Sequence, residues 1–363
     1  MRAIRHAVVV LVGGGFVYPG AAGAHEKWFI DASSHPTSWG AALAPPGIAS
    51  VTVALVLTVI AGVVWRALDR RNVIPGPEAL GAEETSLTKF YAIVPLLLGV
   101  HVAIPLLVLG LRGELFSPNN QLPGAWVYWL GVVQIGVCLS FIYGGLTRLA
   151  AIALAAIWVT GIGVFGLEAM LENLHYLGFA AFFFLTGRGP YAIDRLLFPA
   201  LEPSPDLARR AMVWLRVATG LGLAVVAFTE KLADPALAQA FLQHYPLNFT
   251  PWLGISMSDQ LFVLCAGTTE LFIGLCLAFG FFPRLIVATA WVFINMTLTV
   301  FNWVELVGHL PLYGVMGVLL VWTPTETEQR LWVRGVLGEG RSNRVRKTFA
   351  APEPLAELAR SAT

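Results

Sequence analysis

The sequence predicts an all-α integral membrane protein, and its composition and its apolar runs carry that prediction. Of the 363 residues, 57% are hydrophobic and only 12% are charged, whereas soluble globular domains contain about 25% charged residues. The mean hydropathy is +0.72. The apolar residues also gather into runs, most of them close to the ~20 residues that a helix needs to cross a bilayer. We expect about nine transmembrane helices, at 48–67, 88–111, 126–146, 149–167, 173–187, 211–230, 259–281, 285–303 and 308–322.

The positive charges follow the pattern that such a topology requires. If residue 25 lies outside, the first predicted helix runs inward, and alternation then places most arginines on the cytoplasmic side, as the positive-inside rule demands. These arginines are Arg66, Arg70, Arg71, Arg148, Arg188, Arg195, Arg209, Arg210 and Arg284. We therefore predict a multi-pass protein of the bacterial cytoplasmic (inner) membrane, with its mature N-terminus outside and its C-terminus in the cytoplasm. The bilayer is its first partner, and a net charge of +1 gives no reason to expect nucleic acid.

The first element, residues 1–24, reads as a secretory signal peptide. "MRAIRH" supplies two arginines, "AVVVLVGGGFVYPG" is an apolar run too short and too rich in glycine to span comfortably, and "AAGA" has the small-x-small pattern of a cleavage site. Cleavage after Ala24 would make His25 the new amino terminus. The alternative is an uncleaved anchor, in which His25 and Glu26 are polar residues at the membrane boundary.

The rest of the chain predicts an extra helix followed by two similar units of four helices. "QIGVCLSFIYGGLTRLAAIALAAIWV" from Gln134 and "ELFIGLCLAFGFFPRLIVATAWVFIN" from Glu270 share an early polar residue and an arginine fourteen residues later, Arg148 and Arg284. Because four is even, both units enter the membrane in the same direction, as tandem parallel repeats do. The predicted divisions are 25–87 (outer-face segment and extra helix), 88–187 (first, degenerate unit), 188–210 (cytoplasmic linker), 211–323 (second unit) and 324–363 (basic cytoplasmic tail).

The second unit resembles the DoxX/DoxD-like family of four-helix membrane proteins. The resemblance is carried by "RVATGLGLAVVAFTEKL", by "TELFIGLCLAFGFFPRLIV" and by the short helix after "ELVGHLPL". It covers residues 211–323 well and 88–187 as a degenerate copy, which has Gln134 in place of Glu270 and no counterpart of the pair Glu230-Lys231. The resemblance implies a four-helix bundle and, for the DoxD branch, a part in quinone-linked sulfur oxidation, although a fold does not fix a function.

Polar residues inside the predicted spans mark candidate catalytic positions. A charged side chain within a spanning helix costs about 2.5–3.5 kcal/mol on insertion scales, so it needs a partner or a purpose. Glu270 lies near the middle of its span, and Asn295 lies at a similar depth in the next one. We predict that Glu270, with Asn295, relays protons or contacts a quinone. The alternative is a hydrogen-bonded polar centre that only holds helices together.

Histidines and acids at the predicted outer face form a candidate metal site. Glu172 and His175 are three residues apart, and Glu305 and His309 are four apart, so each pair shares one face of a helix. Imidazoles with carboxylates suit copper, zinc or iron, and a histidine at a free amino terminus, His25, would add a further ligand. The alternative for these histidines is anchoring at the headgroup level, like the many tryptophans at the predicted helix ends.

Together these features predict a redox-associated membrane protein that uses a quinone or an outer-face site containing copper or iron, with a periplasmic redox partner. The three cysteines form no CxxC pair, so no dithiol redox cycle is encoded. The competing hypothesis is a non-catalytic assembly factor or a small-solute transporter.

Overall fold

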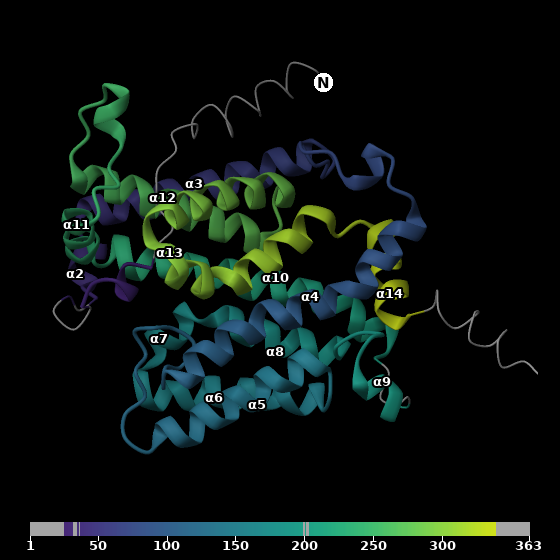
Figure 1. The fold of residues 1–363 in the computed structure, drawn as a ribbon. Coiled ribbons are helices and arrows are strands. Elements are labelled where there is room, and N and C mark those ends of the chain that lie inside the picture. Colours follow the sequence, from purple (N-terminus) through teal and green to yellow (C-terminus); the bar gives the residue numbers. More distant parts are fainter. Residues whose placement is uncertain (1–24, 32–34, 36, 199, 201–202, 339–363) are drawn as a thin grey trace, which may run out of the picture.

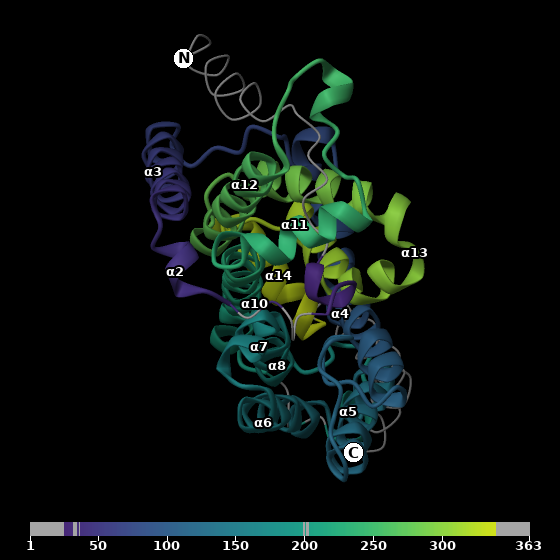
Figure 2. The same ribbon diagram turned by 90° about the vertical axis from the view of Figure 1, so that its left-hand side faces the viewer.

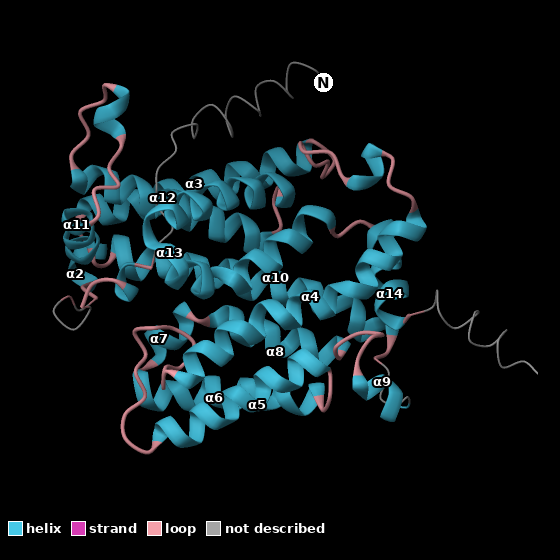
Figure 3. Cartoon of the chain, in the orientation of Figure 1, coloured by secondary structure: helices cyan, strands magenta, loops and turns pink. Residues whose placement is uncertain are grey.

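The computed structural model describes residues 25–31, 35, 37–198, 200 and 203–338. Within these residues every regular element is a helix and no strand is formed (Figure 3). Seven helices of the described chain are long and apolar enough to cross a membrane, so the protein is an all-helical, multi-pass membrane protein. The predicted signal peptide, residues 1–24, lies outside the described residues.

The seven candidate spans differ from the nine predicted ones in two places. They are α3 (Pro45–Ala67), α4 (Glu84–Leu111), α5 (Trp126–Tyr143), α6 (Thr147–Phe165), α10 (Pro205–Ala227) continued by η6 (Phe228–Leu232), α12 (Asp259–Phe279) and the second half of α13 (Pro283–Val321). The predicted spans 173–187 and 285–303 correspond to shorter apolar segments, α8 (Leu174–Thr186) and the first part of α13, Pro283–Leu298. The prediction of nine spans is therefore not confirmed.

Short elements cover the two ends of this bundle (Figure 1). One end, which we call the η2 end, carries η2 (Glu26–Trp28), α2 (Trp39–Ala42), α7 (Leu167–Glu172), α11 (Pro235–His244) and η7 (Thr250–Leu253). The other end, the α14 end, carries η4 (Pro77–Leu80), α9 (Ile193–Leu197) and α14 (Glu326–Leu337). The long helices run between the two ends.

The helices pack in two neighbouring groups. Helices α4, α5, α6 and α8 lie side by side, and α10 packs against α12, which in turn contacts α3 at the edge of the molecule (Figure 2). Contacts of α8 with α10 and of α4 with α13 join the groups. The first part of the predicted C-terminal tail is α14, which packs against α4 and α10, and its Trp332 Nε1 donates to Ala208 O at 2.8 Å.

Two glycines allow α10 and α12 to approach closely. A Cβ at Gly220 would collide with the backbone of Ala278 and Gly274, and one at Gly274 would lie 2.7 Å from Ala224 N. Small residues at such crossings are typical of membrane helix pairs, where close backbone packing drives association. The crossing fixes α10 against α12 and so holds Lys231, at the end of η6, beside Glu270.

Helix α13 bends back on itself. Arg284 near its start donates from Nε to Leu320 O at 2.9 Å and from Nη2 to Val321 O at 2.9 Å. In a straight helix, residues 36 positions apart would be about 54 Å apart at 1.5 Å per residue. The two halves of α13 therefore lie antiparallel, and Thr297 Oγ1 donates to Glu305 Oε1 at 2.6 Å near the bend.

Candidate functional site

The segment from His25 to Trp28 inserts its side chains into the η2 end of the bundle. Glu26 is almost completely buried, and its two carboxylate oxygens lie 2.9 and 3.1 Å from Lys231 Nζ. The Nδ1 atom of His25 lies 3.2 Å from Glu230 Oε1. Because residues 25 and 26 contact residues about 205 positions away, the N-terminal segment ties itself to the end of α10 and η6.

Two consecutive charged residues, Glu230 and Lys231, are both buried in the π-helix η6. Between Phe228 and Leu232 the helix takes π geometry, a widened turn that occurs often at functional sites. Glu230 and Lys231 are 1% and 3% exposed. Lys231 Nζ also lies 3.0 Å from Glu270 Oε2. We call Glu26, Glu230, Lys231 and Glu270 the acid–lysine cluster.

A second ionic group lies nearer the surface. Lys27 Nζ donates to Glu168 Oε1 at 2.9 Å and to Glu172 Oε1 at 2.5 Å. Thr37 also donates to Glu168, and Thr229 of η6 donates to Glu172 at 2.7 Å. Since 43% of the Glu168 side chain is exposed, this group connects η6 to the solvent-facing side of α7.

Aromatic rings pack around the histidines of this end. His25 stacks on Trp28 with ring centroids 4.3 Å apart and on His309 at 5.5 Å. Trp28 lies over Gly308, where any Cβ would collide with the indole ring. His309 Nδ1 is 3.2 Å from Glu305 Oε1. The glycine is therefore needed for the N-terminal segment to seat.

The structure brings the five predicted metal ligands to one region but not into a metal centre. His25, Glu172 and His175 line a cavity of about 10 Å³, roughly the space of one water molecule, and His175 Nε2 is buried there without a hydrogen-bond partner. Yet within the described residues no group of three or more His, Cys, Asp or Glu side chains is arranged to hold a metal ion. His25 contacts Glu230 and Trp28, whereas His309 lies beside Glu305 with its buried Nδ1 lacking a hydrogen-bond partner, and metal binding stays a prediction.

Burial sets the protonation of the N-terminal residues. Burial and the neighbouring His309 lower the pKa of His25 to about 3, so the imidazole is neutral at pH 7. Burial raises the pKa of Glu26 to about 8, against the opposing effect of Lys231, so this carboxyl is mostly protonated at pH 7. Burial opposes the charge on Lys27, but Glu172 and Glu230 outweigh it and raise its pKa. Glu26 is thus an acid that holds a proton next to a lysine.

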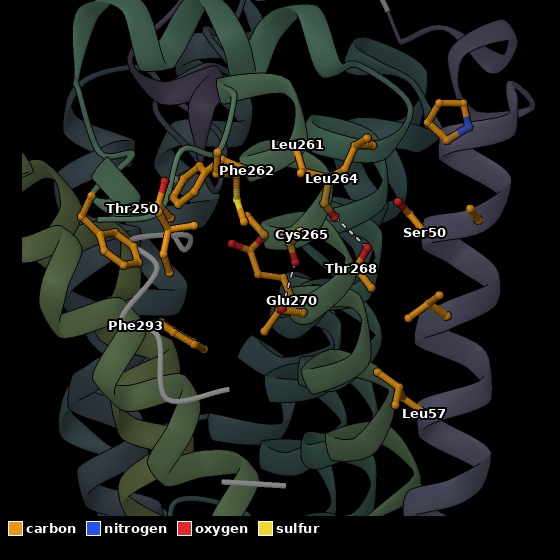
Figure 4. Close-up of a pocket in the computed structure, with 18 residues that line it drawn as sticks. Ser50, Leu57, Thr250, Leu261, Phe262, Leu264, Cys265, Thr268, Glu270 and Phe293 are labelled. Atoms are coloured by element: carbon orange, nitrogen blue, oxygen red, sulfur yellow. Dashed lines mark hydrogen bonds between the residues drawn. The ribbon is translucent and has the colours of Figure 1, made fainter. Parts of the chain in front are cut away.

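A pocket of about 610 Å³ lies beside the acid–lysine cluster, between α3, α12 and the loop with η7. Figure 4 shows Ser50 and Leu57 of α3 facing Leu264 and Thr268 of α12. Most of the lining is apolar. Among the described residues that line this pocket, Glu270 is the only carboxylate, with 15% of its side chain exposed and with Oε1 lacking a hydrogen-bond partner.

The structure does not bring Asn295 to Glu270. Its amide donates to Trp291 O of its own helix at 2.7 Å, and its side chain is exposed. Asn295 borders a different, open surface hollow with Trp291 and Val292. Of the two predicted catalytic residues, only Glu270 lies at the pocket.

Four residues of this site were not predicted from sequence: Glu26, Lys27, Glu230 and Lys231. Two adjacent charges at the end of an apolar span, "FTEKL", are a signal that could have identified Glu230 and Lys231, since such charges need partners. Nothing local in "HEKW" shows that Glu26 is buried or that Lys27 pairs with Glu168 and Glu172.

Comparisons with protein-family models, with curated proteins and with solved structures find no match to this chain. The resemblance to the DoxX/DoxD-like family therefore remains a prediction.

Proposed function

We propose that this chain is a redox-associated membrane protein that binds a quinone-class ligand in the pocket between α3 and α12. The observation that carries the proposal is a single carboxylate, Glu270, in the wall of an otherwise mostly apolar pocket among apolar helices. A volume of about 610 Å³ lies within the 300–1,000 Å³ usual for ligand sites, which are mostly apolar with a few polar groups.

The chemistry of a quinone matches this lining. A quinone takes up two electrons and two protons to become the quinol, so its site needs an apolar slot and a group that exchanges protons. Glu270 would exchange a proton with the ligand, and Lys231 at 3.0 Å balances the carboxylate charge. The electrons would pass to or from a periplasmic redox partner. The predicted resemblance to the DoxD branch supports the same ligand class.

The proposal extends to the finer architecture. We propose that α4, α5, α6 and α8 form one four-helix unit, that α10, α12 and the two halves of α13 form another, and that the two are tandem repeats. The α14 end, which carries Arg188, Arg195 and Arg284, would face the cytoplasm of a bacterium, as the positive-inside rule favours.

Binding of a short-chain quinone to the purified protein tests the function. Isothermal titration with decylubiquinone should show saturable binding. Glu270→Gln should weaken it by about tenfold or more, because a hydrogen-bonding charged group is lost from an apolar site. Ala49→Phe, which fills the pocket, should abolish it. Asn295→Ala, at a similar depth but outside the pocket, is the matched control and should bind as wild type.

An outcome without binding would favour the alternative functions. A wild-type protein that binds neither decylubiquinone nor a menaquinone analogue, while it copurifies with partner subunits, would overturn the quinone proposal in favour of an assembly factor.

A further inference from the structure

We propose that a buried proton path connects the pocket to solvent at the η2 end, from Glu270 through Lys231, Glu26, Glu230, His25, Glu172 and Lys27 to Glu168. What the path serves rests on the proposed function, since the proton at Glu270 would be exchanged with the quinone. The path itself stands on the geometry of the described side chains.

The inner half of the path is a continuous chain of close contacts. Glu270 Oε2 lies 3.0 Å from Lys231 Nζ, which lies 2.9 Å from Glu26 Oε1. Glu26 in turn shares a hydrogen bond with the Glu230 carboxylate. Both contacts of Lys231 lie within the roughly 2.6–3.2 Å over which a proton passes directly between heavy atoms.

His25 and a small cavity join the inner half to the outer half. The Nδ1 atom of His25 faces Glu230 at 3.2 Å, and the ring also lines the cavity of about 10 Å³ that reaches Glu172. One water fits in a space of that size. An imidazole can accept a proton at one nitrogen and release one at the other, so His25 with one water spans the gap between Glu230 and Glu172.

The outer half ends in solvent. Glu172 lies 2.5 Å from Lys27 Nζ, which lies 2.9 Å from Glu168. Glu168 is 43% exposed, whereas the other carboxylates of the path are at most 15% exposed. Glu168 is therefore the exit of the path, and the apolar pocket at Glu270 is its other end.

Each group of the path gains one proton and loses one proton during a transfer. For outward transfer, a proton first enters at the Glu270 carboxylate. Glu26 then passes its proton to the Glu230 carboxylate, and Glu230 passes it through His25 and the cavity water to the Glu172 carboxylate. Lys27 gives a proton to the Glu168 carboxylate, which releases it to solvent, and Glu172 reprotonates Lys27. Lys231 reprotonates Glu26 and takes the proton of Glu270. One proton enters at Glu270 and one leaves at Glu168, and every group between them returns to its starting state.

The composition of the path argues against a purely structural ion cluster. It holds five carboxyl groups, those of Glu26, Glu168, Glu172, Glu230 and Glu270, and two lysines. Burying charges is costly unless each is paired, so a cluster that served only stability would match acids to bases. The excess of acids leaves carboxyl groups without a matching base, and such groups can hold and pass protons.

Infrared spectroscopy of hydrogen–deuterium exchange tests the path without needing a bound ligand. The carbonyl stretch of protonated carboxyl groups lies apart from the carboxylate bands and shifts when the protein is moved into D2O. A component of this band should be missing in Glu26→Gln, which assigns it. In wild type that component should exchange quickly. His25→Phe keeps an aromatic ring stacked on Trp28 but loses a relay step. In this variant the Glu26 component should exchange at least about tenfold more slowly than in wild type.

Two further variants keep the test decisive. Glu168→Gln, at the exposed exit, should also slow the exchange and is expected to fold even if His25→Phe does not. Glu83→Gln, at an exposed carboxylate just before α4 that accepts from Thr85 at 3.1 Å, should exchange as wild type. Equal rates in wild type, His25→Phe and Glu168→Gln would overturn the path, provided that thermal unfolding shows the variants are folded.

The same samples separate this inference from the proposed function. If exchange is slowed in the variants but wild type binds no quinone, the proton path is supported and the quinone proposal is overturned. If wild type binds quinone but exchange is unaltered in the variants, the quinone proposal is supported and the proton path is overturned.

Discussion

Helices α5 and α12 each carry a polar residue at positions that the sequence predicts to be equivalent, the buried Gln134 and the partly exposed Glu270. The amide of Gln134 donates to Leu106 O at 2.9 Å and to Glu114 O at 3.2 Å, so it links α5 to α4 and to the chain that follows α4. Glu270 instead contacts Lys231 and lines a pocket. A polar residue in a membrane helix is thus not by itself a sign of function, because its partners decide whether it holds helices or handles protons.

The largest effect on stability is expected from the removal of Lys231. Lys231→Met leaves Glu26 and Glu270 buried without their shared cation, and breaking a buried ion pair costs about 3–5 kcal/mol. We expect that loss in the free energy of unfolding, measured by denaturant unfolding in detergent. The double variant with Glu270→Gln should recover part of the loss. A loss below about 1 kcal/mol would show that the cluster is not desolvated as described.

The pH dependence of stability should distinguish the acid–lysine cluster from the site of Gln134. The pKa of Glu26 is raised to about 8, so the folded state holds a proton that the unfolded state has released. Stability should therefore fall as pH rises from 6.5 to 8, by roughly 1–2 kcal/mol, and level off above. His25, whose pKa is lowered to about 3, contributes the opposite slope only below pH 6.5. Glu26→Gln should flatten the fall between pH 6.5 and 8, and a fall of wild-type size in that variant would exclude Glu26 as its source.

Substitution of Gln134 should cause a smaller loss of stability that does not depend on pH. Gln134→Met removes hydrogen bonds to two main-chain carbonyls and keeps the side-chain volume, so stability should drop by about 1 kcal/mol. The drop should be the same at pH 6.5 and 8, and quinone binding should be unchanged. A change in binding of the size caused by Glu270→Gln would make the two positions functionally alike after all.

The smallest effect on stability is expected at the exposed end. Glu168 is 43% exposed and shares Lys27 with Glu172, and exposed ion pairs contribute about 0–1 kcal/mol. Glu168→Gln should therefore shift the unfolding midpoint very little, measured by thermal unfolding in detergent, even though it is expected to slow proton exchange. A loss comparable to that of Lys231→Met would mean that Glu168 is a structural residue.

The sequence predicts the membrane class and part of the site for reasons that are local. Apolar runs and the i, i+3 and i, i+4 spacings of Glu172 with His175 and of Glu305 with His309 are visible over a few residues, and the structure places both pairs at the η2 end. Glu270 is conspicuous because a carboxylate in an apolar run is costly. Asn295 is equally conspicuous, but its helix presents it to the surface, and depth along a span says nothing of which way a side chain faces.

The remainder depends on contacts between distant segments. Glu26 is buried because it docks on η6, and Lys27 reaches Glu168 and Glu172 of α7. Neither contact has a signature in residues 25–28. The burial of Glu230 and Lys231 in η6 goes together with the close packing of α10 against α12 at Gly220 and Gly274, which joins segments far apart in the sequence. The return of α13 depends on Arg284 reaching Leu320 and Val321, and apolar runs alone do not show how closely two successive segments associate.

The docking of the N-terminal segment also has a consequence for biosynthesis. Glu26 and Lys231 are 205 residues apart, so at about 5–20 residues per second the ribosome needs roughly 10–40 s to make the partner after it has made Glu26. Gly308, which receives Trp28, is made later still. Through that interval the first residues of the described chain have no binding site, and their insertion must be among the last events of assembly. The Trp28 indole can pack over Gly308 only after the helices that precede Gly308 have been synthesised. This contact therefore marks a late stage in the assembly of the bundle.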